Sequence, residues 1–277
     1  MLVAPARTQA DFPLWPPLLA SRGKGGRSGK HAHHALHFVL AIDGELRAKV
    51  GDRWRCAAGV VTAPDAVHEI DASDSEVLIV FLDPESVAGA AIAGLIASAE
   101  PLLDSSTVGS RPRAKARTQA FRSLTASERD QLVDLTPAQL MRKDGVAWAQ
   151  RTAAVLGASS SLGVTPGAVN VHPRVRRALR HLQSLPPEGD QSLEALAKVA
   201  GLSEGRFMHA FTESVGIPLR PYLAWLKLQR AAAAIVTGSS LGEAAHGAGF
   251  SDAAHMTRSF RRMFGVKPSE LRPAKPV

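Results

Sequence analysis

The first third of the chain alternates short apolar runs with turn residues. The pairs Asp43-Gly44 and Gly51-Asp52 separate three of these runs. Asp-Gly supplies the positive φ angles that tight hairpins need, so at least one hairpin is predicted here. Several short strands at this spacing are typical of a small barrel or sandwich. The predicted strands are residues 36–42, 45–50, 53–57, 59–63, 67–70 and 76–82.

The pattern changes after Pro84, where the spacing of apolar residues becomes helical. Three helices, rich in Ala, Leu, Gln and charged residues, are predicted at 85–99, 127–142 and 146–156. Ser127, with Asp130 three residues later, is the expected N-cap of the second helix. Residues 157–170 are small, polar and uncharged, which is typical of a flexible linker and predicts a domain boundary.

The segment after this linker is helical and contains an internal repeat. Residues 193–203 (LEALAKVAGLS) are echoed by residues 241–251 (LGEAAHGAGFS). In each copy a small residue is followed four positions later by glycine, then by a large apolar residue and a polar cap, as in a helix-turn-helix. The helix that follows each copy is expected to end at Gly216 or Gly265. Two helix-turn-helix units are therefore predicted, at about 192–216 and 240–265, joined by a helix over 220–236.

The net charge of +8 is unevenly distributed along the chain. Residues 1–165 carry 18 Lys+Arg and 17 Asp+Glu, whereas residues 166–277 carry 15 and eight. A C-terminal module with most of the excess positive charge favours a polyanionic partner, most often nucleic acid.

Other classes of protein are disfavoured by the composition. The Ala- and Gly-rich uncharged run at residues 87–99 is shorter than the ~20 apolar residues of a membrane span. The N-terminus has no apolar stretch of the secretory type, so no secretory signal is expected. Cys56 is the only cysteine, which excludes internal disulfides and fits a reducing cytoplasm.

The tandem motif resembles a known family. The resemblance is carried by residues 201–223 (GLSEGRFMHAFTESVGIPLRPYL) and 249–272 (GFSDAAHMTRSFRRMFGVKPSELR), within about 172–273. These segments resemble the tandem helix-turn-helix domain of AraC/XylS-type bacterial transcription regulators. The resemblance implies a seven-helix domain in which the third and sixth helices read DNA.

The resemblance also implies which residues contact DNA. Gly205, Ala253 and Ala254 occupy base-facing positions without a hydrogen-bonding side chain, so Arg258 and His209 are expected to make the hydrogen-bonded readout. The full base-facing set is Gly205, Met208, His209, Ala253, Ala254, Thr257 and Arg258. The residues expected at phosphates are Arg206, Lys227, Arg261, Arg262 and Lys267.

Five of the ten histidines lie between positions 31 and 68. The spacing Gly25-x5-His31-x-His33-x3-His37-x6-Gly44 resembles the first cupin motif, with His37 in place of the usual glutamate, and Gly59-x4-Pro64-x3-His68 resembles a looser second motif. Sensory domains of AraC-type regulators are commonly cupin-like, so the two resemblances support each other. They imply a convergence of His31, His33, His37 and His68.

Imidazole side chains suit Zn, Cu, Ni or Fe, so these four histidines form a candidate metal site. An effector pocket lined by histidines without a metal is the alternative. His34 is expected on the opposite strand face, because the other three nearby histidines differ by even numbers. Trp15 and Trp54 are expected in the core or a pocket wall, and Cys56 is expected to be buried.

These observations predict an α+β fold with two domains. A cupin-like sensor and dimerisation domain is expected at 1–156, with a β-barrel at about 20–83 and helices at about 85–156; the linker 157–170 leads to an all-α DNA-binding domain at 171–277. The predicted protein is a cytoplasmic, sequence-specific regulator of transcription that binds double-stranded DNA and a small-molecule or divalent metal effector. It is expected to be no enzyme, to require no cofactor, to form a homodimer, and to contact RNA polymerase if it activates. The alternatives are a cupin metalloenzyme fused to a DNA-binding module, and an architectural DNA-binding protein without an effector.

Overall fold

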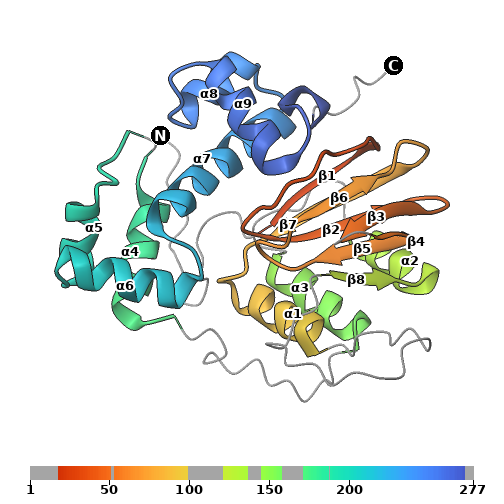
Figure 1. The fold of residues 1–277 in the computed structure, drawn as a ribbon, viewed down its shortest axis with the longest axis horizontal. Coiled ribbons are helices and arrows are strands. Elements are labelled where there is room, and N and C mark those ends of the chain that lie inside the picture. Colours follow the sequence, from red (N-terminus) through yellow and green to blue (C-terminus); the bar gives the residue numbers. More distant parts are fainter. Residues whose placement is uncertain are drawn as a thin grey trace, which may run out of the picture.

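The computed structural model describes residues 18–50, 53–98, 121–136, 145–157, 171–186 and 188–271. A β-rich N-terminal domain lies beside a helical C-terminal domain (Figure 1). The predicted linker, residues 157–170, lies outside the described residues apart from Gly157. Among the described helices, none is both long and apolar enough to cross a lipid bilayer.

The N-terminal domain contains two antiparallel sheets. The larger has the strand order β1-β7-β2-β5-β8 and the smaller β4-β3-β6. Backbone bridges between His31 and His68, and between Arg27 and Asp71, connect the segment before β2 to the smaller sheet. The strands are β1 (Leu18–Lys24), β2 (Leu36–Ala41), β3 (Leu46–Val50), β4 (Arg53–Ala57), β5 (Gly59–Thr62), β6 (His68–Asp71), β7 (Glu76–Leu82) and β8 (Phe121–Leu124).

The strand positions agree with the predicted ones, but one pairing differs. Gly44 has the expected positive φ of 68°. The turn at Asp43-Gly44 nevertheless forms no hairpin, because β2 pairs with β5 and β7 whereas β3 pairs with β4 and β6. It carries the chain from the larger sheet to the smaller one. The hairpin is instead β3–β4, whose turn at Gly51-Asp52 lies outside the described residues.

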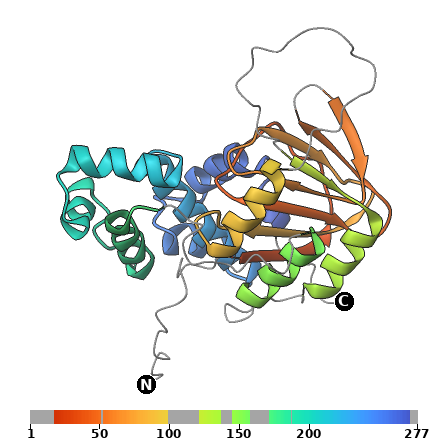
Figure 2. The ribbon, with the colours of Figure 1, turned by 90° about the horizontal axis from the view of Figure 1, so that it is seen from below.

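The larger sheet is covered on both faces, which explains why β2 is buried along its whole length. Val39 and Ala41 face the smaller sheet in one apolar cluster, while Phe38 and Leu40 face the helices in another. Figure 2 shows the three helices against this sheet. They are α1 (Val87–Ser98), α2 (Ala126–Leu135) and α3 (Gly145–Val155).

The predicted N-cap of α2 is wrong. The cap is Thr125 rather than Ser127, because Thr125 and Glu128 form a complete capping box. The Thr125 hydroxyl accepts from the Glu128 N–H at 3.2 Å, and the Glu128 carboxylate accepts from the Thr125 N–H at 2.9 Å.

Two residues expected in the interior lie on the surface. Trp54 is 37% exposed and Cys56 is exposed. Both belong to β4, an edge strand whose first four residues are exposed on both faces. Cations instead of core residues surround the Trp54 ring, with Arg27 and Arg47 at 5.7 and 5.8 Å from its centroid. Trp15 lies outside the described residues.

The C-terminal domain consists of six α-helices and a final 3-10 helix within residues 171–186 and 188–271. The third and sixth, α6 and α9, occupy the places of the two expected recognition helices. Each ends at a glycine in the left-handed conformation, Gly216 at φ 86° and Gly265 at φ 71°. The elements are α4 (Pro173–Ser184), α5 (Leu193–Ala200), α6 (Glu204–Val215), α7 (Leu219–Val236), α8 (Leu241–Gly247), α9 (Ala253–Phe264) and η2 (Pro268–Leu271).

The two helix-turn-helix units belong to different hydrophobic cores. In the first unit, α4–α6 enclose Tyr222 and Leu226 from the N-terminal half of α7. In the second, α8, α9 and η2 pack on the C-terminal half of α7, and this core continues into the N-terminal domain through Ala35 and Phe81. Both views place α4–α6 apart from the sheets (Figures 1 and 2). The second unit is therefore docked on the β-domain.

Candidate functional site

Four of the N-terminal histidines come together in the interior. His31, His33, His37 and His68 are all buried, and one ring nitrogen from each lies within 4.8 Å of the others. We refer to these four residues as the histidine cluster. The structure thus brings together every residue that the cupin-like spacing indicated.

Local backbone structure brings the rings together. The backbones of His31 and His68 exchange two hydrogen bonds of 3.1 and 2.9 Å, which set their rings 4.2 Å apart. His37 lies on β2 in alternation with Val39, so its side chain faces the smaller sheet. His33 lies between these elements, with its ring 4.8 Å from that of His37.

Hydrogen bonds fix the tautomers of two cluster members. Nδ1–H of His31 donates to the Gly29 carbonyl, and Nδ1–H of His68 donates to the Ala66 carbonyl, both at 2.7 Å. A nitrogen that faces a carbonyl must carry the proton, so Nε2 of each ring presents its lone pair to the cluster. Metal-binding histidines in proteins are oriented by the same kind of bond.

The remaining nitrogens lack partners. Nε2 of His31, His37 and His68 and Nδ1 of His33 are buried without a hydrogen bond among the described residues. Nε2 of His33 and Nδ1 of His37 are 3.2 Å apart. If His37 donates in this pair, its Nε2 also has a free lone pair. Three Nε2 atoms can then coordinate, and His33 can orient His37 or turn to provide a fourth ligand.

Burial keeps the cluster neutral. It lowers the pKa of His31, and burial together with neighbouring imidazoles holds the pKa of His33 and His37 well below 6.5. Burial and the nearby His31 lower the pKa of His68 to about 4. Neutral imidazole is the form that binds metals, so the cluster is in its ligating state at neutral pH.

His34 is separated from the cluster, on the side expected from its spacing. Its Nδ1 and Nε2 lie 2.8 and 2.5 Å from carboxylate oxygens of Asp65 and Glu85. Burial alone would lower the pKa of His34, but Glu85 and Asp65 outweigh it and raise the pKa to about 10. A protonated imidazole cannot coordinate a metal, so His34 serves as an ion-pair partner.

The C-terminal domain forms one wall of the histidine cluster. Trp225 of α7 stacks on His33 with ring centroids 6.1 Å apart, and Phe264 of α9 lies at the same distance. Phe81 stacks on His37 at 4.4 Å. The Gly29 N–H donates to the Gly265 carbonyl at 3.2 Å. The cluster therefore lies at the interface between the two domains.

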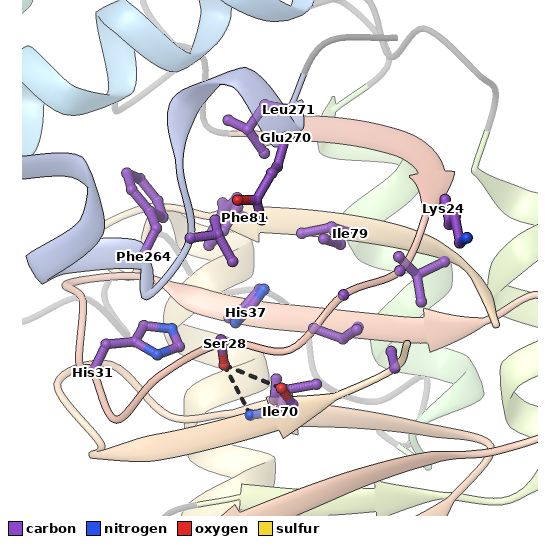
Figure 3. Close-up of a pocket in the computed structure, with 16 residues that line it drawn as sticks. Lys24, Ser28, His31, His37, Ile70, Ile79, Phe81, Phe264, Glu270 and Leu271 are labelled. Carbon is purple, nitrogen blue, oxygen red and sulfur yellow. Dashed lines mark hydrogen bonds between the residues drawn. The ribbon is translucent and has the colours of Figure 1, made fainter. Parts of the chain in front are cut away.

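A cavity of about 340 Å³ adjoins the cluster. In Figure 3, His31 and His37 approach it from the N-terminal domain and Phe264 from the C-terminal domain, while Lys24 lies at the end away from His31. Most of the other lining is apolar. Such a cavity can hold an apolar molecule with one polar group directed at the histidines.

The expected DNA-reading residues face solvent. On α6, the base-facing residues Gly205, Met208 and His209 are exposed; on α9, Ala254 and Arg258 are exposed and Ala253 and Thr257 half-buried. Among the residues expected at phosphates, Lys227 is tied to the second turn, because its ammonium donates to the Gly249 carbonyl at 3.1 Å. The others are exposed: Arg206, Arg261, Arg262 and Lys267.

The comparison with known families decides the identity of this domain. Residues 196–274 match the family model described as a helix-turn-helix domain, which spans both turns and both recognition helices. Residues 196–274 therefore form a helix-turn-helix domain of the AraC type.

Likeness of fold to solved structures extends over most of the chain. A crystal structure of ToxT from Vibrio cholerae is 9% identical, with a TM-score of 0.53 over 92% of this chain and 96% of that chain. ToxT bound to an unsaturated fatty acid is 10% identical, with a TM-score of 0.50 over 91% and 94%. ToxT bound to (E)-4-(8-methylnaphthalen-1-yl)but-3-enoic acid is 9% identical, with a TM-score of 0.54 over 92% and 97%. At these identities the likeness is one of fold, a β-domain followed by two helix-turn-helix units.

Sequence reasoning missed the C-terminal wall of the cluster. The sequence predicts Trp225, Phe264 and Gly265 only as parts of a helical domain. They are far from the histidines in the sequence, and only the docking of the second unit brings them there. One local feature distinguishes this position, since Phe264 stands where the first unit has the smaller Val215.

Proposed function

We propose that this AraC-type regulator responds to a divalent transition metal held by His31, His33, His37 and His68. The observation that carries the proposal is the set of four neutral, buried imidazoles within 4.8 Å, three of which have an unpartnered Nε2. A buried polar atom without a partner costs about 1–3 kcal/mol, and a bound metal would remove this cost.

The donor set indicates the class of metal. All four donors are imidazole nitrogens, which suit Zn, Cu, Ni, Co or Fe. Mg and Ca prefer oxygen ligands, and the cluster contains none. When bound, the metal would supply positive charge and fixed coordination geometry between the two domains.

A titration of the chelator-treated, full-length protein tests the proposal. Zinc, copper, nickel and cobalt should each be tried, with about one ion per chain expected by elemental analysis. His68→Leu should abolish uptake, while His246→Ala, at an exposed histidine outside the cluster, should leave it intact. His34→Ala is a poorer control, because it breaks a buried ion pair. If the protein takes up none of these metals, the proposal is wrong.

A second candidate is an apolar small molecule in the adjoining cavity. Its support is the volume of about 340 Å³ and the mainly apolar lining from both domains. The ligands named for ToxT, an unsaturated fatty acid and a naphthalenyl butenoic acid, are of this kind. A fatty acid that raises the melting temperature equally in the wild type and in His68→Leu would favour this candidate. Ala72→Phe, which fills part of the cavity, should remove that response.

A further inference from the structure

We infer that the contact between Gly265 and the loop of residues 28–31 transmits the state of the histidine cluster to the second recognition helix, α9. This inference rests on the metal-binding function proposed above and names its regulation. The contact joins the backbones of the two domains, and it involves none of the residues expected to contact DNA.

The end of α9 is fitted closely to this loop. A Cβ atom added to Gly265 would lie 2.7 Å from Nδ1 of His31 and 2.9 Å from the Gly29 carbonyl oxygen. Real Cβ contacts are longer than this, so only glycine allows the approach. The hydrogen bond from the Gly29 N–H to the Gly265 carbonyl then joins the two backbones.

The loop is tied to the cluster at several points. His31 donates from Nδ1 to the Gly29 carbonyl at 2.7 Å, so its ring and the loop backbone are linked. The Ser28 N–H donates to the Ile70 carbonyl at 2.8 Å, and the His31 and His68 backbones are paired. A displacement of His31 must therefore carry the loop, and with it the end of α9.

We expect metal binding to cause such a displacement. Ligand nitrogens in a tetrahedral zinc site lie about 3.3–3.4 Å apart, as follows from Zn–N bonds of about 2.0–2.1 Å. The candidate ligand nitrogens of the cluster lie within 4.8 Å of one another, so coordination would draw inward any pair that is farther apart than the zinc-site spacing. Two recognition helices read successive turns of DNA about 34 Å apart, so a shift of α9 relative to α6 changes their joint fit.

The first unit provides a natural control. Gly216 ends α6 as Gly265 ends α9, also with positive φ, but a Cβ there would meet no atom within 4 Å. The contact at Gly265 is therefore no requirement of the helix-turn-helix fold. Gly216→Ala and Gly265→Ala introduce the same kind of backbone strain, and only the second also pushes against the loop.

Hydrogen exchange with and without zinc tests the inference in the full-length protein. Zinc should change exchange of α9 in the wild type and in Gly216→Ala, and leave α9 unchanged in Gly265→Ala. On a site selected from random DNA by the wild type, zinc should change affinity by at least about five-fold in the first two proteins and by less than about two-fold in Gly265→Ala. Gly265→Ala should still bind one zinc ion per chain.

A second pair of variants tests the inference if Gly265→Ala does not fold. Gly29→Pro removes the N–H that donates to Gly265, whereas Gly29→Ala keeps it and places a Cβ in open space. Only the proline variant should lose the zinc response of α9. If wild type binds zinc but both Gly265→Ala and Gly29→Pro transmit it fully, the inference is wrong and the metal site stands. If wild type binds no transition metal, the proposed function and this inference both fail.

Discussion

The two helix-turn-helix units share a fold but differ in what surrounds them. α6 and α9 are both 12 residues long, and both end at a left-handed glycine. The first unit closes its own core around Phe207 and Phe211, whereas the core of the second continues into the β-domain through Phe81. At matching positions, Val215 stays within its unit while Phe264 reaches the histidine cluster. An internal repeat thus predicts the fold of both units but not their surroundings, and only the second unit packs against the β-domain.

Lowering the pH should produce the largest difference in stability between the two units. The folded cluster holds lowered pKa values, about 4 for His68, so the unfolded chain binds protons at about 6.5 while the folded protein does not. For His68, the stability that depends on a neutral ring is present above pH 6.5 and is lost as pH falls from about 6.5 to about 4, by up to about 1.4 kcal/mol per pH unit. The lowered pKa values of His31, His33 and His37 add losses of the same sign. With a chelator present, hydrogen exchange should show α9 losing protection before α6. Simultaneous loss in both helices would contradict the asymmetry.

Truncation of one aromatic residue in each unit should have the next largest effect. Phe264→Ala and Phe211→Ala each remove a buried ring and should cost about 3–5 kcal/mol of unfolding free energy. Of these two rings, only that of Phe264 contacts Phe81 and His33, so only the Phe264 truncation should also change metal affinity and the imidazole NMR signals. If both truncations change metal affinity and the imidazole signals equally, the cluster does not depend on its contact with the second unit in particular.

The contribution of each unit to DNA reading can be compared at Arg258 and His209, which are both exposed. Arg258→Ala should cost about 1–3 kcal/mol on a cognate site if the guanidinium pairs with guanine, and should relax the preference at that position. His209→Ala tests the first unit in the same way. Competition between selected and random DNA measures the preference. If Arg258→Ala weakens both DNAs equally, Arg258 is a phosphate contact.

The smallest effects are expected at the phosphates. Lys267→Ala in the second unit and Arg206→Ala in the first each remove one exposed cation. Each should weaken binding to all sequences alike, and reduce the slope of log affinity against log salt by about 0.9. A titration over salt concentration distinguishes these losses from the sequence-dependent loss at Arg258.

The strands and helices could largely be predicted, because alternation and helical spacing are local properties. Pairing could not, since the Asp43-Gly44 turn has hairpin chemistry but joins two different sheets. β1 and β8 were missed because LLASRGK lacks regular alternation and FRSL is too short to show any. The exposure of Trp54 and Cys56 follows from the edge position of β4, which no local pattern reveals.

The histidines of the site could be predicted from the sequence, again because side-chain alternation is a local property, whereas the wall from the C-terminal domain could not. The even spacing of His31, His33 and His37 places them on one side of an extended chain and His34 on the other, because side chains alternate along a strand. The wall that Trp225 and Phe264 contribute depends on packing between domains. Such packing depends on complementary shapes, which periodicity and composition do not encode.

The division of α7 between two cores has a consequence for exchanging DNA specificity. Leu226 belongs to the first core and Leu228 to the second, within one helix of 18 residues. A chimera with its junction between these leucines could take its first unit from another regulator. It would keep its own sensing interface only if Trp225, which lies on the imported side of the junction, were retained. The helical register of α7 would have to be kept across the junction, because each inserted residue turns the imported unit by about 100° and moves it about 1.5 Å along the helix axis. Insertions at this junction therefore offer a graded way to reset the spacing and phase of the two half-sites that the protein accepts.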